Sequence, residues 1–164
     1  MNSSRQRGFA YLWTLMLVAF MGIGSVIGAE LYATSVRRDK ERELIFIGHE
    51  FRAAIARYYN SGAGGQASYP LTLEELLKDP RFPNVRRHLR RLYADPVSGK
   101  AEWGLLRVQG RIVGVHSLSA RAPIKQDNFE DIDAGLRHKP SYAEWNFVYP
   151  FDLFVPPAAS PAGG

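Results

Sequence analysis

The sequence predicts an α+β fold in which one long N-terminal helix packs against a small antiparallel β-sheet. Three features predict it: an uncharged run near the N-terminus, an apolar stripe with helical spacing after that run, and two short β-prone segments joined by a turn. The chain has 164 residues, of which 46% are hydrophobic. This length allows one domain with a core in addition to the helix.

The N-terminal run has the length of a membrane span. Phe9 to Ala29 are 21 consecutive positions without a charged side chain. A helix of this length measures about 31 Å, which matches the hydrocarbon core of a bilayer. Thr14 and Ser25 do not give such a helix a polar face, which a buried core helix would need. We therefore expect a transmembrane helix at 9–29, preceded by a short basic segment at 1–8.

The helix is expected to continue beyond the run. After a charged segment, apolar residues recur at intervals of three and four, which places them on one side of a helix. The span and its soluble continuation at 30–60 would form one helix of about fifty residues, whose second half packs on the domain that follows. The stripe consists of Leu44, Ile47, Phe51, Ile55 and Tyr58.

A small α+β domain is expected at 61–149. The Gly- and Ser-rich segment 60–66 would end the long helix. Thr72 to Glu75 has the pattern of a capping box before a short helix that closes at Asp79-Pro80. A further turn or short helix is expected between Val85 and Tyr93.

The C-terminal half has the period of β-strands. Glu102–Val108 and Arg111–Leu118 are separated by Gln109-Gly110, a pattern that predicts a β-hairpin. Trp145–Tyr149 is expected to complete an antiparallel sheet. The last segment, 150–164, is rich in Pro, Ala and Gly and is expected to be a disordered tail.

The sequence contains no recognisable catalytic pattern. It has no cysteine, which excludes disulfides, thiolate metal sites and cysteine nucleophiles. The four histidines stand far apart, and no nucleophile elbow or phosphate-binding loop occurs in a fitting context. We expect a protein that is not an enzyme and that carries no cofactor.

Basic residues cluster once. The net charge is +5, and five basic or imidazole side chains lie within six positions, at Arg86, Arg87, His88, Arg90 and Arg91. Such a run can bind phosphates, but it can also cover a solvent-facing surface. The second interpretation is favoured because no aromatic side chain interleaves with the run, and no nucleic-acid partner is expected.

The N-terminus resembles that of a known family. Arg7-Gly8-Phe9, followed at once by the uncharged run and a long helix, is similar to the prepilin-type N-terminus of type IV pilins and type II secretion pseudopilins. The resemblance implies that a prepilin peptidase cuts between Gly8 and Phe9 and methylates the new amino group. It also implies a pilin-like fold, with inner-membrane lipid and other pilin or pseudopilin subunits as partners.

Assembly in this family proceeds through the apolar helix. Most members carry a glutamate five residues into the mature chain, where this sequence has Trp13, a departure that fits a minor or specialised subunit. Small residues allow helices to approach closely in lipid. The residues expected to contact neighbouring subunits are Trp13, Leu15, Val18, Gly22, Gly24 and Gly28.

The C-terminal half is similar to the major pseudopilins of type II secretion. Asp95-Pro96, Trp103 and Ser117-Leu118-Ser119 follow the order of the motifs in those proteins, in which the next loop binds calcium. Here that loop, Ala120–Tyr142, also carries basic residues and lacks the glycine-rich spacing of the family. A solvated loop without metal is therefore favoured, and a calcium site is the alternative. Its ligands would be Asp127, Glu130, Asp131 and Asp133.

Together these features predict a pseudopilin-like structural subunit of a type II secretion or type IV pilus-like filament. It would cross the bacterial inner membrane once, with its soluble domain in the periplasm. A strict count of Lys and Arg beside the span favours the opposite orientation, and here the family resemblance is followed.

Several alternatives stay open at this point. The main one is an unprocessed, membrane-anchored periplasmic module that binds a ligand or DNA. The run could also be a secretory signal that ends at Ala29, or a plain signal anchor.

Overall fold

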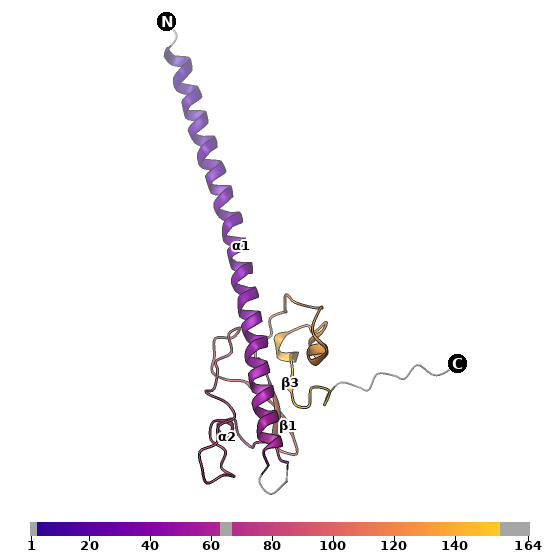
Figure 1. The fold of residues 1–164 in the computed structure, drawn as a ribbon. Helices are drawn as coiled ribbons and strands as arrows, with labels where there is room; N and C mark the ends of the chain where they lie inside the picture. The colour runs from indigo at the N-terminus through magenta and orange to yellow at the C-terminus, as the bar shows by residue number, and fades with distance from the viewer. Residues whose placement is uncertain (1–2, 63–66, 155–164) are drawn as a thin grey trace, which may run out of the picture. The chain divides into compact units, whose positions relative to one another are not determined.

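The computed structural model describes the backbone of residues 3–62 and 67–154, and within helix α1 it describes no side chain of residues 3–10 or 22–31. The chain divides into two compact units, Met1–Asp39 and Lys40–Gly164. Its elements are one long and one short α-helix, two 3-10 helices and a three-stranded sheet, which confirms the α+β class (Figure 1). In chain order they are α1 (Ser3–Asn60), α2 (Glu74–Leu77), β1 (Gly104–Val108), β2 (Arg111–His116), η2 (Asp131–Leu136), η3 (Tyr142–Glu144) and β3 (Phe147–Val148).

Helix α1 confirms the predicted continuous helix and has 58 residues. Its end at Asn60 agrees with the Gly- and Ser-rich segment that follows. Among the described residues, no helix combines the length and the hydropathy needed to cross a bilayer. Of the predicted span, the side chains at 9, 10 and 22–29 lie outside the described residues.

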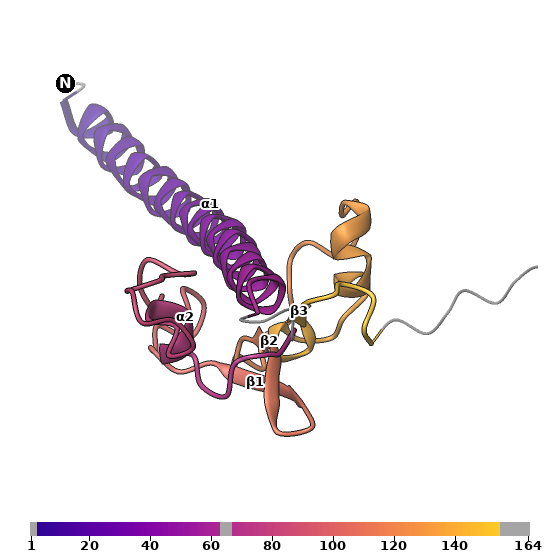
Figure 2. The ribbon, with the colours of Figure 1, turned by 60° about the horizontal axis from the view of Figure 1, so that its bottom comes forward.

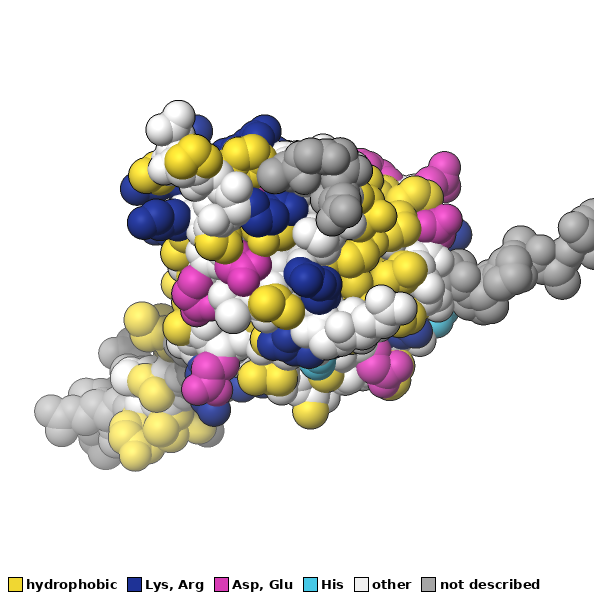
Figure 3. All heavy atoms as spheres, turned by 90° about the horizontal axis from the view of Figure 1, so that it is seen from below, with side chains coloured by type: hydrophobic (Ala, Val, Ile, Leu, Met, Phe, Trp, Pro, Cys, Tyr) yellow, Lys and Arg dark blue, Asp and Glu magenta, His cyan; other side chains and the backbone are white. Residues whose placement is uncertain are grey.

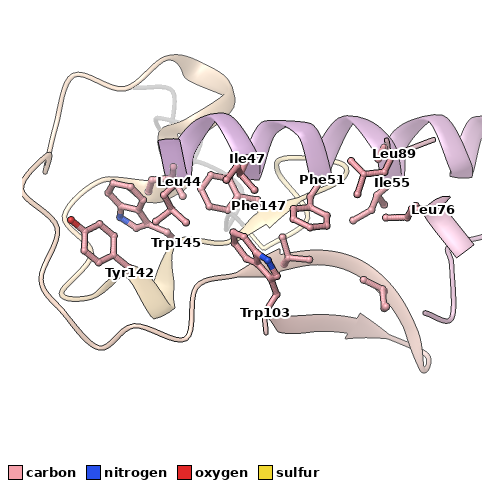
Figure 4. Packing of buried hydrophobic residues seen from close by; sticks show 14 of the residues in the cluster. Leu44, Ile47, Phe51, Ile55, Leu76, Leu89, Trp103, Tyr142, Trp145 and Phe147 are labelled. Atoms are coloured by element: carbon pink, nitrogen blue, oxygen red, sulfur yellow. The ribbon is translucent and has the colours of Figure 1, made fainter. Parts of the chain in front are cut away.

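The second unit forms around the apolar stripe of α1. All five predicted stripe residues are buried, from Leu44 to Tyr58, which confirms the interpretation of their spacing. Leu44, Ile47 and Phe51 lie on the side of the helix that faces Trp145, Phe147 and Trp103, and Ile55 lies beside Leu76 and Leu89 (Figure 4). The Phe51 and Trp103 rings meet edge to face, with centroids 5.1 Å apart.

The sheet has the order β1-β2-β3, with both pairs antiparallel. The predicted hairpin is confirmed, and Gln109 and Gly110 both have positive φ, as its tight turn requires. Leu106 and Arg107 are consecutive in β1 but pair with Gly114 and Ile112, so the extra residue, Val113, makes a bulge in β2. The third strand exists, but it is limited to Phe147–Val148 of the predicted Trp145–Tyr149. Figure 2 shows the sheet beside the C-terminal end of α1.

The two smaller helix predictions need correction. Helix α2 exists, but its N-cap is Leu73 and no side chain caps it, so the predicted capping box is wrong. The Glu75 carboxylate instead accepts hydrogen bonds from the Leu71 amide and the Tyr58 hydroxyl. No helix forms between Val85 and Tyr93. There the backbone folds back onto α2, because the amides of His88 and Leu89 both donate to the Leu76 carbonyl.

Candidate functional site

The N-terminal half of α1 exposes large apolar side chains. Between positions 11 and 21 their exposed fractions range from 50% to 72%. At 100° per residue, they point in every direction around the helix axis. Among the residues that the structure describes, these apolar side chains are therefore exposed on every side of the helix. The residues are Tyr11, Leu12, Trp13, Leu15, Met16, Leu17, Val18, Phe20 and Met21, here called the apolar segment.

The apolar segment contains part of the predicted assembly site. Trp13, Leu15 and Val18 belong to it and are at least half exposed. The side chains at the other predicted positions lie outside the described residues, both the processing pair Gly8 and Phe9 and the glycines at 22, 24 and 28.

In the second unit, two of the three motifs singled out from the sequence are joined, those at Asp95 and Ser117. Asp95 is fully buried, and one carboxylate oxygen accepts a hydrogen bond from Ser117 Oγ at 2.7 Å. The other accepts from the Val97 amide at 2.9 Å and so shapes the turn. Trp103 Nε1 donates to the Tyr93 carbonyl at 2.7 Å. These hydrogen bonds brace the domain.

Glu41 fastens the loop after the hairpin to α1. Its carboxylate accepts hydrogen bonds from the amides of Ile124 and Lys125, at 2.7 and 2.9 Å, and from the Tyr142 hydroxyl at 2.7 Å. The side chain is 5% exposed. Sequence reasoning missed this role because Glu41 lies in a charged segment that reads as a solvated helix face.

Asp133 makes the second connection between the loop and α1. Its two carboxylate oxygens lie 2.7 Å from His49 Nε2 and 2.9 Å from Arg52 Nη1. Burial raises the pKa of the Asp133 carboxyl, but the hydrogen bonds from His49 and Arg52 outweigh burial and hold the pKa below its usual value. Asp133 is 4% exposed, so the prediction of a plainly solvated loop is wrong at this residue.

The other predicted calcium ligands do not converge on Asp133. Glu130 and Asp131 are exposed, and Asp127 lies 3.8 Å from the guanidinium of Arg137. Among the described residues, no three Asp, Glu or His side chains form a group that could hold a metal ion. Arg52 and His49 thus occupy the two carboxylate oxygens of Asp133 that a metal ion would otherwise bind.

A fourth buried acid, Asp79, organises the segment beside α2. Arg81 donates to both of its oxygens, at 2.9 and 2.6 Å, and His88 Nε2 lies 2.9 Å away. Burial raises the pKa of Asp79, but hydrogen bonds from Arg81 and His88 bring it down to about 2. Burial also lowers the pKa of His88, in spite of its bond to Asp79. The neutral imidazole can then donate to the ionised carboxylate.

Comparison of the chain with protein-family models, curated proteins and solved structures finds no match.

Proposed function

We propose that this protein is a pseudopilin-like structural subunit that is anchored in the bacterial inner membrane and assembles with other subunits through the N-terminal half of α1. The observation that carries the proposal is the exposed apolar segment. Burying one large apolar side chain contributes about 1.5–3 kcal/mol. Nine such side chains represent more free energy than the net stability of an ordinary domain, so this surface requires a nonaqueous partner.

Lipid and neighbouring helices together can supply that partner. The span is proposed from the sequence, in which 21 uncharged positions run from Phe9 to Ala29. A surface that is apolar on all sides can face lipid on one side and the same helix of another subunit on the other. The subunit then acts mechanically, as part of a filament of a type II secretion or type IV pilus-like system, with its second unit in the periplasm.

The second unit supports a mechanical role. Its loop is held to α1 by buried contacts of Glu41 and Asp133, and its turn is held to the segment after β2 by the hydrogen bond between Asp95 and Ser117. Buried polar groups with their partners in place specify one rigid arrangement. Such a unit can transmit force from its helix without a bound cofactor.

Intact mass tests the processing step. The full chain is purified from membranes of cells with and without a prepilin peptidase. We expect a chain that starts at N-methylated Phe9 only when the peptidase is present. Gly8→Val should block the mass change, and Ser4→Val should leave it intact. A leader that stays attached in both strains would favour the unprocessed, tethered binding module.

Cross-linking tests the assembly step. The chain has no cysteine, so a single introduced cysteine reports on its own surroundings. We expect Val18→Cys to give disulfide-linked dimers in oxidised membranes. Lys100→Cys, in the exposed turn of the second unit, is the control and should give far fewer. Equal yields at both positions would argue against assembly through the helix.

A further inference from the structure

A groove with arginine walls runs between the second half of α1 and the segment 86–90. It consists of two hollows of about 430 and 610 Å³, and Arg57, Arg87 and His88 line both of them. Both hollows are open to solvent, so they form a surface groove and not an enclosed pocket. The polar side chains that matter for the argument are Glu50, Arg57, Asn60, Arg86, Arg87 and Arg90.

The groove is strongly cationic. Its four arginines are all exposed to solvent, while Glu50 is the one acidic side chain among the described residues that line it. Figure 3, a view from below, shows Lys and Arg side chains in dark blue gathered on the left, the side on which α2 lies in Figure 1. The Arg57 and Arg87 side chains are shared by both hollows, so the positive charge is continuous between them.

Two of these arginines are held in place by the protein. Arg57 Nη2 donates to the His88 carbonyl at 2.7 Å, and the Arg86 guanidinium lies 4.7 Å from the centre of the Phe82 ring. Arginine heads that are already ordered lose less entropy when they bind an anion. This ordering distinguishes the groove from a basic surface whose arginine side chains only contact solvent.

The other two arginines are free to bind. Within the part of the chain that the structure describes, no ion pair or hydrogen bond engages the side chain of Arg87 or Arg90. Guanidinium groups match the geometry of carboxylates and phosphates through paired hydrogen bonds. The groove therefore combines fixed and available donors for an anionic group.

The lining favours an acidic peptide over a nucleic acid. Binding of single-stranded nucleic acid uses exposed aromatic side chains for stacking, whereas no Phe, Tyr or Trp among the described residues lines either hollow and the His88 ring is buried. Glu50 would also repel a continuous phosphate backbone, whereas a peptide can place a neutral residue beside it. We infer that this groove is a docking site for a carboxylate-rich segment of a partner protein.

Peptide binding tests the inference on the full chain in non-ionic detergent. The probe is a fluorescent ten-residue polyglutamate, with polyglutamine and ten-residue oligothymidylate as comparison probes. We expect polyglutamate to bind most tightly, and Arg87→Gln/Arg90→Gln to weaken its affinity about tenfold or more. The variant Arg87→Glu/Arg90→Glu should lose its affinity for polyglutamate and gain affinity for a polylysine probe of the same length.

Matched controls make the result decisive. Lys100→Gln/Arg121→Gln removes the same charge from exposed positions outside the groove and should change the affinity less than about twofold. An equal loss in this control would overturn the inference, because it would reflect net charge alone. The inference would also be overturned if the oligonucleotide bound more tightly than polyglutamate. It would likewise be overturned if the protein associated with itself without polyglutamate and the arginine variants abolished that association. Processing at Gly8 and cross-linking at Val18 involve none of these residues, so failure of one proposal is distinguishable from failure of the other.

Discussion

The buried carboxylate of Asp95 accepts a 2.7 Å hydrogen bond from Ser117 Oγ, and both residues are fully buried although 22 positions separate them in the chain. The bond ties the turn before β1 to the segment that follows β2. Ser117 Oγ also accepts a hydrogen bond from the Ser119 amide at 3.0 Å. One hydroxyl thus serves two buried partners.

We expect Ser117→Ala to lower the free energy of unfolding by about 2–3 kcal/mol, because it leaves one oxygen of a buried carboxylate and one buried amide without their partners. Urea unfolding of the full chain in non-ionic detergent, followed by tryptophan fluorescence, measures the change. Ser98→Ala is the control. Its hydroxyl accepts from the Lys100 amide in an exposed turn, so its loss should cost less than about 1 kcal/mol.

Local patterns predicted most of this architecture. The hairpin is signalled by Gln109-Gly110 between two β-prone runs, and the stripe from Leu44 to Tyr58 already has the spacing of its buried face. Asp95 and Ser117, two of the residues singled out from the sequence, are hydrogen-bonded to each other, while Trp103 is bonded to Tyr93. In each case the pattern that predicts the structure lies within a short stretch of sequence, or in a turn that few residue types can form.

Contacts between distant charged residues could not be predicted in this way. Glu41 lies in a charged helical segment and Asp133 in a polar loop, so each reads as a solvated side chain. Their burial depends on partners about eighty residues away in the chain, such as Arg52 for Asp133. The capping box at Thr72 failed for a related reason, because Glu75 hydrogen-bonds to Tyr58 of α1 instead of capping α2.

Gly48, the one glycine of α1 in the second unit, should tolerate a side chain poorly. A Cβ at this position would collide with the ring of Phe147. Alanine is the better helix former by about 1 kcal/mol, but overpacking of a core costs about 1–3 kcal/mol. The contact with the Phe147 ring is close enough to outweigh helix propensity, so we expect Gly48→Ala to destabilise the protein by up to about 2 kcal/mol in urea unfolding.

A double-mutant cycle identifies the cause of this effect. In a Phe147→Leu background the alanine methyl has more room, so Gly48→Ala should cost less than it does in the parent chain. An equal cost in both backgrounds would show that the Phe147 ring is not responsible.

The protein should lose stability as the pH falls, in two steps. The pKa of His88 is lowered by burial, so its stabilising contribution is present above the usual value near 6.5 and declines below it. The pKa of Asp79 is lowered to about 2, so its contribution declines as the pH falls from about 4 toward 2. Both groups bind protons more readily in the unfolded chain, so the free energy of unfolding falls with falling pH in both steps.

Variants separate the first step from general acid effects. His88→Gln should reduce the loss of unfolding free energy between pH 7.5 and pH 5, as measured by urea titration at each pH. His138→Asn is the control at an exposed histidine and should behave like the parent chain. If His88→Gln leaves the pH dependence unchanged, the first step has another source.

Calcium should not change the stability of the second unit. Both oxygens of Asp133 already have partners in His49 and Arg52, and Glu130 and Asp131 are exposed. A site with a dissociation constant of about 10 μM would add about 2.7 kcal/mol at 1 mM calcium. We expect equal melting temperatures in 1 mM CaCl2 and in 1 mM EDTA. A rise of several degrees with calcium, but not with magnesium, would contradict this.

Arg52 should be essential to the loop because its guanidinium is the buried cation that faces Asp133. The two side chains are 7% and 5% exposed. Removing one partner of a buried ion pair costs about 3–5 kcal/mol, since the other charge stays buried without compensation. His49 remains as a second partner, so we expect Arg52→Met to cost about 3 kcal/mol in urea unfolding.

The double variant Arg52→Met/Asp133→Asn should recover part of this loss, because it no longer buries an unpaired carboxylate. If the double variant is less stable than Arg52→Met alone, the packing of the arginine side chain, and not its charge, holds the loop on α1.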